Sequence, residues 1–135
     1  MWEEVKRILQ TSHSVAVVGL SPDRNRPSYQ VATYLQRAGY DVTPVNPNCQ
    51  SVLGKRCYGS LADVPGPVDI VTIFRRSEHV PPIVAQAVAK GARMVWMQDG
   101  IINQEAAASA RAAGLVTVMD RCIMRDHAGL HWKEN

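Results

Sequence analysis

Residues 14–19 read SVAVVG, a run of small and β-branched apolar residues that ends in glycine. Four further short apolar runs follow, and in several of them apolar residues stand at successive positions instead of alternating with polar ones. Strands that are covered on both faces have this pattern, which is typical of a parallel sheet. The runs are residues 14–19, 41–45, 68–74, 92–97 and 115–119.

Amphipathic segments lie between these runs. Each of three segments repeats apolar residues at helical spacing and is followed by a glycine, which tolerates the left-handed conformation that ends many helices. A further helix is expected at residues 1–10. The three segments are residues 28–38, 78–90 and 103–113, and the third opens with a capping-type Asn103.

Alternation of strands and helices with right-handed crossovers predicts an open, doubly wound sheet. We therefore expect a single Rossmann-like α/β domain over residues 1–135, with helices on both faces of the sheet. About five mainly parallel strands are expected in the order 3-2-1-4-5, and residues 56–58 form a weak additional candidate.

The composition restricts the partners of the chain. The net charge is +3 and the basic residues are scattered, which suits an anionic small molecule and disfavours nucleic acid. No apolar run reaches the ~18 residues of a membrane span, and the first residues lack the apolar core of a signal peptide. Three cysteines without a C-x-x-C pair favour a reducing, cytoplasmic location.

In a doubly wound sheet the ligand binds at the carboxyl ends of the strands, beside the first strand. The loop that follows the first strand combines a glycine at its start, serine hydroxyls, free backbone amides, two arginines and the start of a helix, all of which favour phosphate. Proline is compatible with that helix start. The alternative is a polar turn with surface arginines. The candidate residues are Gly19, Leu20, Ser21, Arg24, Arg26, Pro27 and Ser28.

The second strand ends in Asn46, Pro47 and Asn48. An NAD-binding domain carries an acidic residue there to hold the ribose hydroxyls, so NAD is disfavoured. NADP stays open, because Lys55 and Arg56 are within reach of a ribose phosphate.

Two later strand ends supply further candidates. Phe74, Arg75 and Arg76 follow the third apolar run, and the arginines suit bidentate phosphate binding, although a solvated pair at a helix start is the alternative. The stretch Trp96, Met97 and Gln98 ends the fourth run and suits a groove wall, although tryptophan is as often found in a core.

The best candidates for chemistry follow the last strand. Arg121 and Arg125 would favour a Cys122 thiolate, with His127 as a base, but a buried, inert cysteine is the favoured interpretation. Cys122, His127 and His131 match no common zinc spacing, so we expect neither a metal site nor a catalytic residue.

The sequence closely resembles small stand-alone CoA-binding proteins related to the N-terminal domain of the succinyl-CoA synthetase alpha subunit. The resemblance covers nearly the whole chain in order. It rests on VAVVGLSPDRNRPSYQVATYL, GYDVTPVNPN, LGKRCYGSLADVPGPVDIVTIFRRSEHVPPIV, GARMVWMQDGIINQEAA and AGLVTVMDRCIMRDH.

The resemblance implies a Rossmann-like fold with CoA across the carboxyl edge of the sheet. It places the pyrophosphate at residues 19–21, the adenosine end near residues 46–48, and the rest of the cofactor between residues 74–76 and 96–98. The chain departs from the synthetase pattern, because its first loop is not glycine-rich and the domain with the phosphorylated histidine is not in this sequence. The resemblance therefore does not imply acyl-CoA ligation.

We expect a non-catalytic module that binds CoA or an acyl-CoA and acts as a sensor, carrier or regulator. One alternative is an NADP-linked or CoA-dependent transfer enzyme that uses Cys122 or His127. Another is a subunit whose site a partner chain completes. A protein partner or a homo-oligomer is possible in each case, whereas nucleic acid and membranes are not expected as partners.

Overall fold

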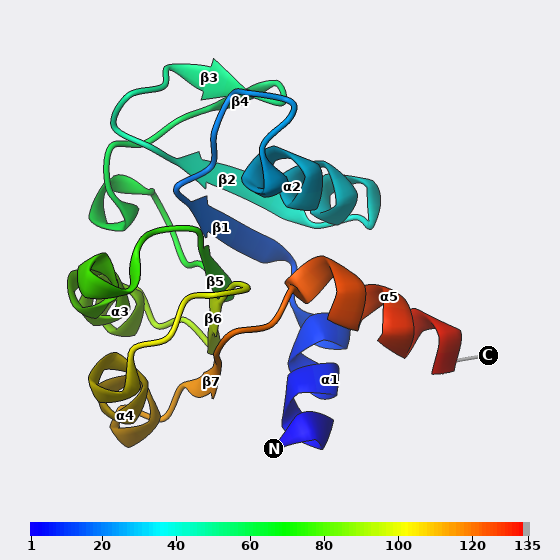
Figure 1. Ribbon diagram of the computed structural model, residues 1–135, viewed down its shortest axis with the longest axis vertical. Coiled ribbons are helices and arrows are strands. Elements are labelled where there is room, and N and C mark those ends of the chain that lie inside the picture. Colours follow the sequence, from blue (N-terminus) through cyan, green and yellow to red (C-terminus); the bar gives the residue numbers. More distant parts are fainter. Residues whose placement is uncertain (134–135) are drawn as a thin grey trace.

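The protein, seen in a computed structural model that describes residues 1–133 and the side chains of residues 1–130, has a parallel sheet between two layers of helices (Figure 1). In chain order the elements are α1 (Trp2–Thr11), β1 (Ser14–Val18), α2 (Pro27–Arg37), β2 (Asp41–Val45), β3 (Ser51–Val52), β4 (Lys55–Arg56), η1 (Leu61–Asp63), β5 (Ile70–Ile73), η2 (Ser77–His79), α3 (Val80–Ala89), β6 (Met94–Met97), α4 (Gln104–Ala112), β7 (Val116–Val118) and α5 (Ile123–Lys133).

The main sheet has five strands in the order β2-β1-β5-β6-β7, and all of its neighbours are parallel. The order reverses beside β1, so the predicted Rossmann-like class is confirmed. The predicted order 3-2-1-4-5 is wrong for the third apolar run, residues 68–74, which it places outside β2. In the structure this run forms β5, which pairs with β1 and β6. Outside β2 there is only a parallel bridge between Val45 and Tyr58 in the described chain, while β3 and β4 form a small separate hairpin.

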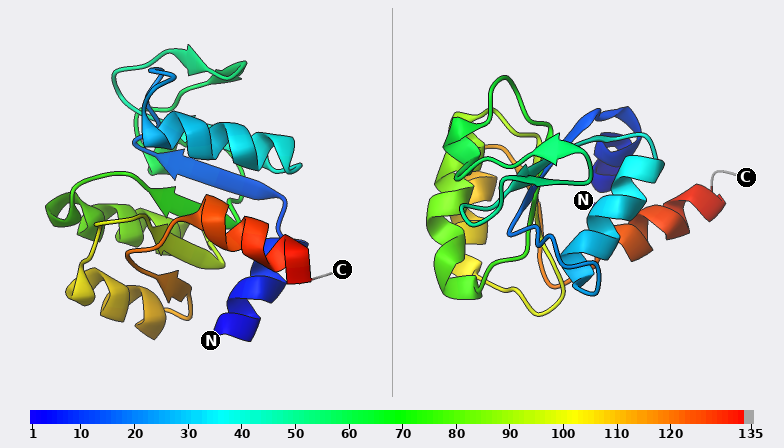
Figure 2. Two further views of the ribbon diagram at one scale, coloured as in Figure 1. Left: turned by 45° about the vertical axis from the view of Figure 1, so that its right-hand side comes forward. Right: turned by 90° about the horizontal axis from the view of Figure 1, so that it is seen from above.

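Successive residues of each strand face opposite layers, as the pleat of a strand requires. Val15 and Val17 of β1 belong to a core under α1, α2 and α5, whereas Ala16 and Val18 belong to a core under α3 and α4. Figure 2 shows the two helical layers on either side of the sheet. This double coverage explains why β5 and β6 are apolar at successive positions and buried throughout.

The four predicted helices are confirmed, and their ends lie within two residues of the predicted ones. Asn103 caps α4 by accepting a hydrogen bond from the Ala106 amide at 2.9 Å. The predicted helix from residue 78 begins instead with the 3-10 turn η2, because Pro81 and Pro82 restrict the start of α3. No helix in the described part of the chain is long and apolar enough to cross a membrane.

Helix α5 is not among the predicted helices, although its pattern is present in the sequence. Ile123, His127 and Leu130 have helical spacing, and Ile123 and Leu130 are buried in the first core. The helix packs beside α2 (Figure 1) and begins at the carboxyl edge of the sheet. The residues considered for chemistry therefore lie on and before the first turns of a core helix.

Candidate functional site

The loops after β1, β2 and β5 meet at the carboxyl edge of the sheet, where the switch of strand order creates the usual ligand crevice. A cleft of about 200 Å³ opens there beside the ends of β1 and β2. Of the predicted residues, Pro47 and Arg75 line it, together with His79 and Ser60, which the sequence analysis did not single out.

Gly19 lets the strand ends approach one another. Its φ is +89°, and a Cβ atom there would lie 2.7 Å from the carbonyl oxygen of Phe74. Its amide donates a hydrogen bond to the Val45 carbonyl at 2.8 Å. The sequence predicted that a ligand would approach Gly19 closely. In this structure the backbone of Phe74 makes that close approach.

The loop after β1 is held in shape by its own side chains. The Ser21 amide donates to the Ser28 hydroxyl at 3.0 Å, and the Asp23 amide donates to the Ser21 hydroxyl at 3.0 Å. Ser28 and Leu20 are buried, whereas Arg24 and Arg26 point to solvent. Ser28 therefore orders the loop, and the arginines supply its positive charge.

Helix α2 begins at Pro27 and has no side-chain cap, because the Arg26 side chain at the N-cap position contains no hydrogen-bond acceptor. The Arg26 carbonyl accepts hydrogen bonds from the Tyr29 and Gln30 amides at 3.1 and 3.2 Å, and Pro27 has no amide hydrogen, so Ser28 has the first-turn amide without an acceptor in the described chain. Uncapped amides at a helix N-terminus carry partial positive charge and bind anions. The two exposed arginines beside this helix end increase the positive potential. Arg26 is only loosely paired, since its Nε lies 3.9 Å from the Asp23 carboxylate.

Asn46 joins the first two loops. Its side-chain amide donates to the Leu20 carbonyl at 2.9 Å, and its Oδ1 accepts from the Asn48 amide at 2.8 Å. The predicted turn of residues 46–48 is thus present beside the first loop. Asn46 supports this turn from within, while Pro47 and Asn48 are exposed on it.

The two arginines after β5 differ in their surroundings. Arg75 is half-buried beside the cleft, and it makes no ion pair within the part of the chain that the structure describes. Arg76 is 84% exposed at its side chain and lies 4.0 Å from Glu78. Phe74 is half-buried and packs against the first core. Arg75 is therefore the better placed of the two to hold an anion in the cleft.

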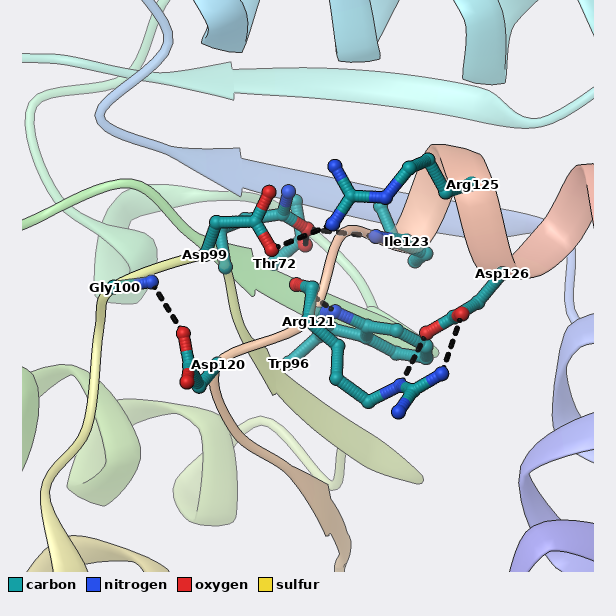
Figure 3. A network of polar contacts seen from close by, with 10 residues as sticks. Thr72, Trp96, Asp99, Gly100, Asp120, Arg121, Ile123, Arg125 and Asp126 are labelled. Carbon is teal, nitrogen blue, oxygen red and sulfur yellow. Dashed lines mark hydrogen bonds and ion pairs between the residues drawn. The ribbon is translucent and has the colours of Figure 1, made fainter.

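The strand end at Trp96, Met97 and Gln98 is closed to solvent. Trp96 and Met97 are fully buried, one in each core, and the Trp96 indole donates to the Arg121 carbonyl at 2.8 Å. Gln98 is 3% exposed, and its Oε1 accepts hydrogen bonds from Thr72 at 3.3 Å and the Ile123 amide at 3.1 Å. The hydrogen bonds of Trp96 and Gln98 attach Arg121 and Ile123, at the start of α5, to the sheet (Figure 3). The three side chains offer no surface to a ligand in this conformation.

A group of ion pairs around this strand end was not foreseen (Figure 3). Arg121 holds Asp126 through two hydrogen bonds of 2.8 and 2.9 Å, and Arg125 holds Asp99 at 2.8 Å. Contact with these carboxylates raises the pKa of both guanidinium groups. Both arginines are thus already paired, so they differ from Arg75. The charges are visible in the sequence, but their pairing depends on the position of α5.

Asp120 connects the loops that follow β6 and β7. It is one of two non-glycine residues with positive φ in the described backbone, at +57°, and its carboxylate accepts a hydrogen bond from the Gly100 amide at 2.6 Å. The loops after β6 and β7 are therefore tied to each other.

Cys122 and His127 have separate environments. Cys122 is 5% exposed within the first core. His127 Nδ1 lies 2.7 Å from the Tyr34 hydroxyl, and its ring packs edge-on against Tyr34 and Tyr40. Among the described residues no three potential metal ligands come together, and the side chain of His131 lies outside that part.

A larger hollow, of about 580 Å³, lies at the opposite edge of the sheet. It is lined by the end of α1, the end of α2, Tyr40 and His127. Burial and the neighbouring Tyr34 raise the pKa of Tyr40 to about 12. Since helices present their carbonyl ends on this side, it is less suited to phosphate than the carboxyl edge.

A doubly wound parallel sheet with a cationic, helix-lined carboxyl edge defines the chain as a Rossmann-like domain. The comparison with protein families identifies the particular kind. The chain belongs to the CoA binding domain family, whose sequence pattern matches residues 13–128. The family resemblance drawn from the sequence is thereby confirmed.

Relatives support this assignment over most of the chain. The uncharacterized protein YneT of Bacillus subtilis is 42% identical over 125 residues, with 93% of each chain covered. Acetate–CoA ligase (ADP-forming) II of Archaeoglobus fulgidus is 35% identical over 80 residues, and the match spans 58% of this chain but only 12% of that enzyme.

Solved structures share the fold. A hypothetical protein from Pyrococcus horikoshii OT3 superposes with a TM-score of 0.93 at 40% identity, covering 97% of this chain and 92% of that one. A Thermus thermophilus protein, described as cell-free ID.343, superposes with a TM-score of 0.90 at 35% identity, covering 95% and 97%.

Proposed function

We propose that the chain binds CoA or an acyl-CoA at the carboxyl edge of its sheet and performs no chemistry of its own. The observation that carries this proposal is Arg75, a half-buried arginine without an ion pair in the described chain, beside a cleft at the ends of β1 and β2. A partly desolvated cation without a counter-charge gains from an anion, and a phosphate group would supply that charge.

The uncapped N-terminus of α2 provides a second anion-binding element. The Ser28 amide, which has no acceptor in the described chain, suits a pyrophosphate lying over the loop after β1, together with Arg24 and Arg26. The turn at Asn46, Pro47 and Asn48 would then lie near the adenosine end of the ligand. No acidic side chain stands in this turn, which favours a phosphorylated ribose over the free hydroxyls of NAD.

A non-catalytic role is supported by the environments of the two candidate catalytic residues. Cys122 is buried in a core, and His127 is engaged by Tyr34 beside the hollow at the opposite edge of the sheet. An acid–base pair must converge on the bound substrate. Replacing Cys122 and His127 should therefore leave CoA binding unchanged, and neither the wild type nor the variants should turn over acyl-CoA or NADPH.

The first experiment is a calorimetric titration with CoA, with dephospho-CoA, NAD and NADP as comparators. We expect one-to-one binding of CoA at micromolar or lower concentration and weaker binding of dephospho-CoA. Preference for NADP, or no binding of CoA, would overturn the proposal.

The second experiment tests the position of the phosphates. Arg75→Ala and Arg26→Ala should each weaken CoA binding by on the order of ten- to a hundredfold, because each removes a charge-assisted hydrogen bond. Arg37→Ala is the matched control, since Arg37 lies at the other end of α2 and lines the hollow at the amino edge. Equal affinity in all three variants would rule out this position.

A third variant addresses the turn. Asn46→Asp places a negative charge beside the expected phosphate and removes the amide that donates to Leu20. We expect weaker CoA binding, and tighter binding would contradict the assignment.

A further inference from the structure

Two of the three cysteines flank the β3–β4 hairpin, which lies at the end of the molecule beyond β2 (Figure 1). In the hairpin, Ser51 pairs with Arg56. The Cys57 amide donates to the Gln50 carbonyl at 2.9 Å, so the pairing extends by one step and Cys57 lies opposite Gln50. Residues paired in this way have Cα atoms about 5.5 Å apart, and Cys49 immediately precedes Gln50 in the chain.

The two cysteines pack in the same core. Both are free; Cys57 belongs to the first core, and Cys49 packs against that core. The Cys49 thiol donates to the Ser51 carbonyl at 3.3 Å, so it lies along the hairpin. The backbone pairing and the shared core place the two residues side by side, as a disulfide requires.

We propose that Cys49 and Cys57 form a reversible disulfide across the base of this hairpin when the protein meets a small disulfide oxidant. This proposal does not depend on which ligand the carboxyl edge binds.

The reaction is a pair of thiol–disulfide exchanges. The Cys49 thiolate attacks one sulfur of an oxidant R–S–S–R, forming Cys49–S–S–R and releasing RS⁻. Cys57 then loses its proton and attacks the Cys49 sulfur, which forms the Cys49–Cys57 bond and releases a second RS⁻. Two protein thiols are oxidised, the oxidant is reduced to two thiolates, and these take up the two protons as RSH.

The order of the two steps follows from exposure. Cys49 is half-buried and accessible to an oxidant, whereas Cys57 is 9% exposed. Burial, followed by the effect of the neighbouring Cys49, raises the pKa of Cys57 to about 12, so its thiolate is scarce. We therefore expect attack first at Cys49 and slower closure by Cys57.

The disulfide would act on the turn beside the candidate site. Cys49 directly follows the turn of residues 46–48, and its amide donates to the Asn46 carbonyl at 3.4 Å. Cys57 precedes Tyr58, whose carbonyl accepts from the Asn46 amide at 2.8 Å. A covalent ring through residues 49–57 would therefore restrict both backbone neighbours of Asn46.

Peptide mapping provides a direct test, because Lys55 and Arg56 place tryptic cleavage sites between the two cysteines. The purified protein is incubated in oxidised and reduced glutathione, free thiols are alkylated in denaturant, and the protein is digested without reduction. The disulfide then joins peptide 38–55 to peptide 57–75, whereas Cys122 lies in the separate peptide 122–125.

We expect the joined peptides in the wild type and in Cys122→Ser, and their disappearance after dithiothreitol. Cys49→Ser should leave Cys57 free for alkylation. Cys57→Ala should retain glutathione on Cys49. The proposal fails if prolonged incubation at raised pH leaves Cys57 alkylatable in the wild type, or if the bridges formed involve Cys122 or a second chain.

Discussion

At the scale of single residues, the carboxyl edge depends on side chains that are small or absent. Gly19 occupies the end of β1, where the Phe74 carbonyl comes so close that a Cβ atom has no room. Its identity was noted in the sequence, but its neighbour was not, because Phe74 is distant in the chain. A residue interpreted as making room for a ligand makes room for the backbone that follows β5.

Gly19→Ala should destabilise the protein by more than the left-handed backbone alone explains. Gly39→Ala is the matched control, because Gly39 has a φ of +104° but a Cβ atom there would meet nothing within 4 Å. We expect a loss of about 1–2 kcal/mol for Gly39→Ala, and at least about 1 kcal/mol more for Gly19→Ala. Urea denaturation measures both. Equal losses would show that the Phe74 contact relaxes without cost.

Asp69 is a second residue whose role only the structure reveals. Its carboxylate accepts hydrogen bonds from the His13 amide at 2.8 Å and the Ser14 amide at 3.2 Å. Burial alone would raise the pKa of Asp69, but these two hydrogen bonds and the charge of Arg93 outweigh it, so the pKa is lowered.

The lowered pKa of Asp69 gives stability a defined pH dependence. A group whose pKa is lower in the folded state stabilises it above the unfolded pKa, about 3.9, and this contribution is lost as the pH falls through the folded value. The stability difference between the wild type and Asp69→Asn should be full at neutral pH and should shrink in acid. Urea titrations at several pH values measure it, and Glu105→Gln controls for loss of a surface charge. If the stability difference between the two proteins stays constant as the pH falls below the unfolded pKa, the lowered pKa does not belong to Asp69.

At the scale of elements, the periodicity of the sequence predicted four helices and missed α5. Three of the four are followed by a glycine and then a strand, whereas α5 follows a polar loop rich in charges. Its attachment to the sheet depends on Gln98, a residue that was interpreted as part of a ligand groove. In the structure the Gln98 side chain holds the first amide of α5, at Ile123, against β5.

Gln98→Leu should therefore loosen α5. The substitution leaves the buried Ile123 amide and the Thr72 hydroxyl without their acceptor, which costs about 2–4 kcal/mol. Thr72→Val is the control, because it removes one donor and leaves the bond to Ile123, so we expect a loss of about 1 kcal/mol or less. Urea midpoints and hydrogen exchange at Ile123 measure the difference. If the two variants lose the same stability, Gln98 does not anchor the helix.

At the scale of the whole molecule, one sheet separates two cores, and every long strand contributes to both. Ile70 of β5 belongs to the first core while Val71 and Ile73 belong to the second, and β6 divides its residues in the same way. Neither helical layer is therefore expected to persist without the other. The single domain over residues 1–135 stays a prediction, which unfolding can test.

Unfolding should consequently be one cooperative transition. A variant without Trp2 and Trp132 leaves Trp96, fully buried in the first core, as its sole fluorescent tryptophan. Its fluorescence and far-ultraviolet circular dichroism should change together in urea. Two separated transitions would indicate that the two layers unfold independently.

Sequence alone determined the alternation of strands and helices, the double burial of the sheet and the edge at which a ligand is expected. Hydrophobic periodicity reports which face of each segment is buried, and chain order then limits the topology. Only the tertiary structure decided which charges are paired. Helix α5 brings Asp126 to Arg121 and carries Arg125 to Asp99, whereas Arg75 has no ion pair in the described chain. The reason is that a hydrogen bond or ion pair depends on distances between residues far apart in the chain, which local patterns do not contain.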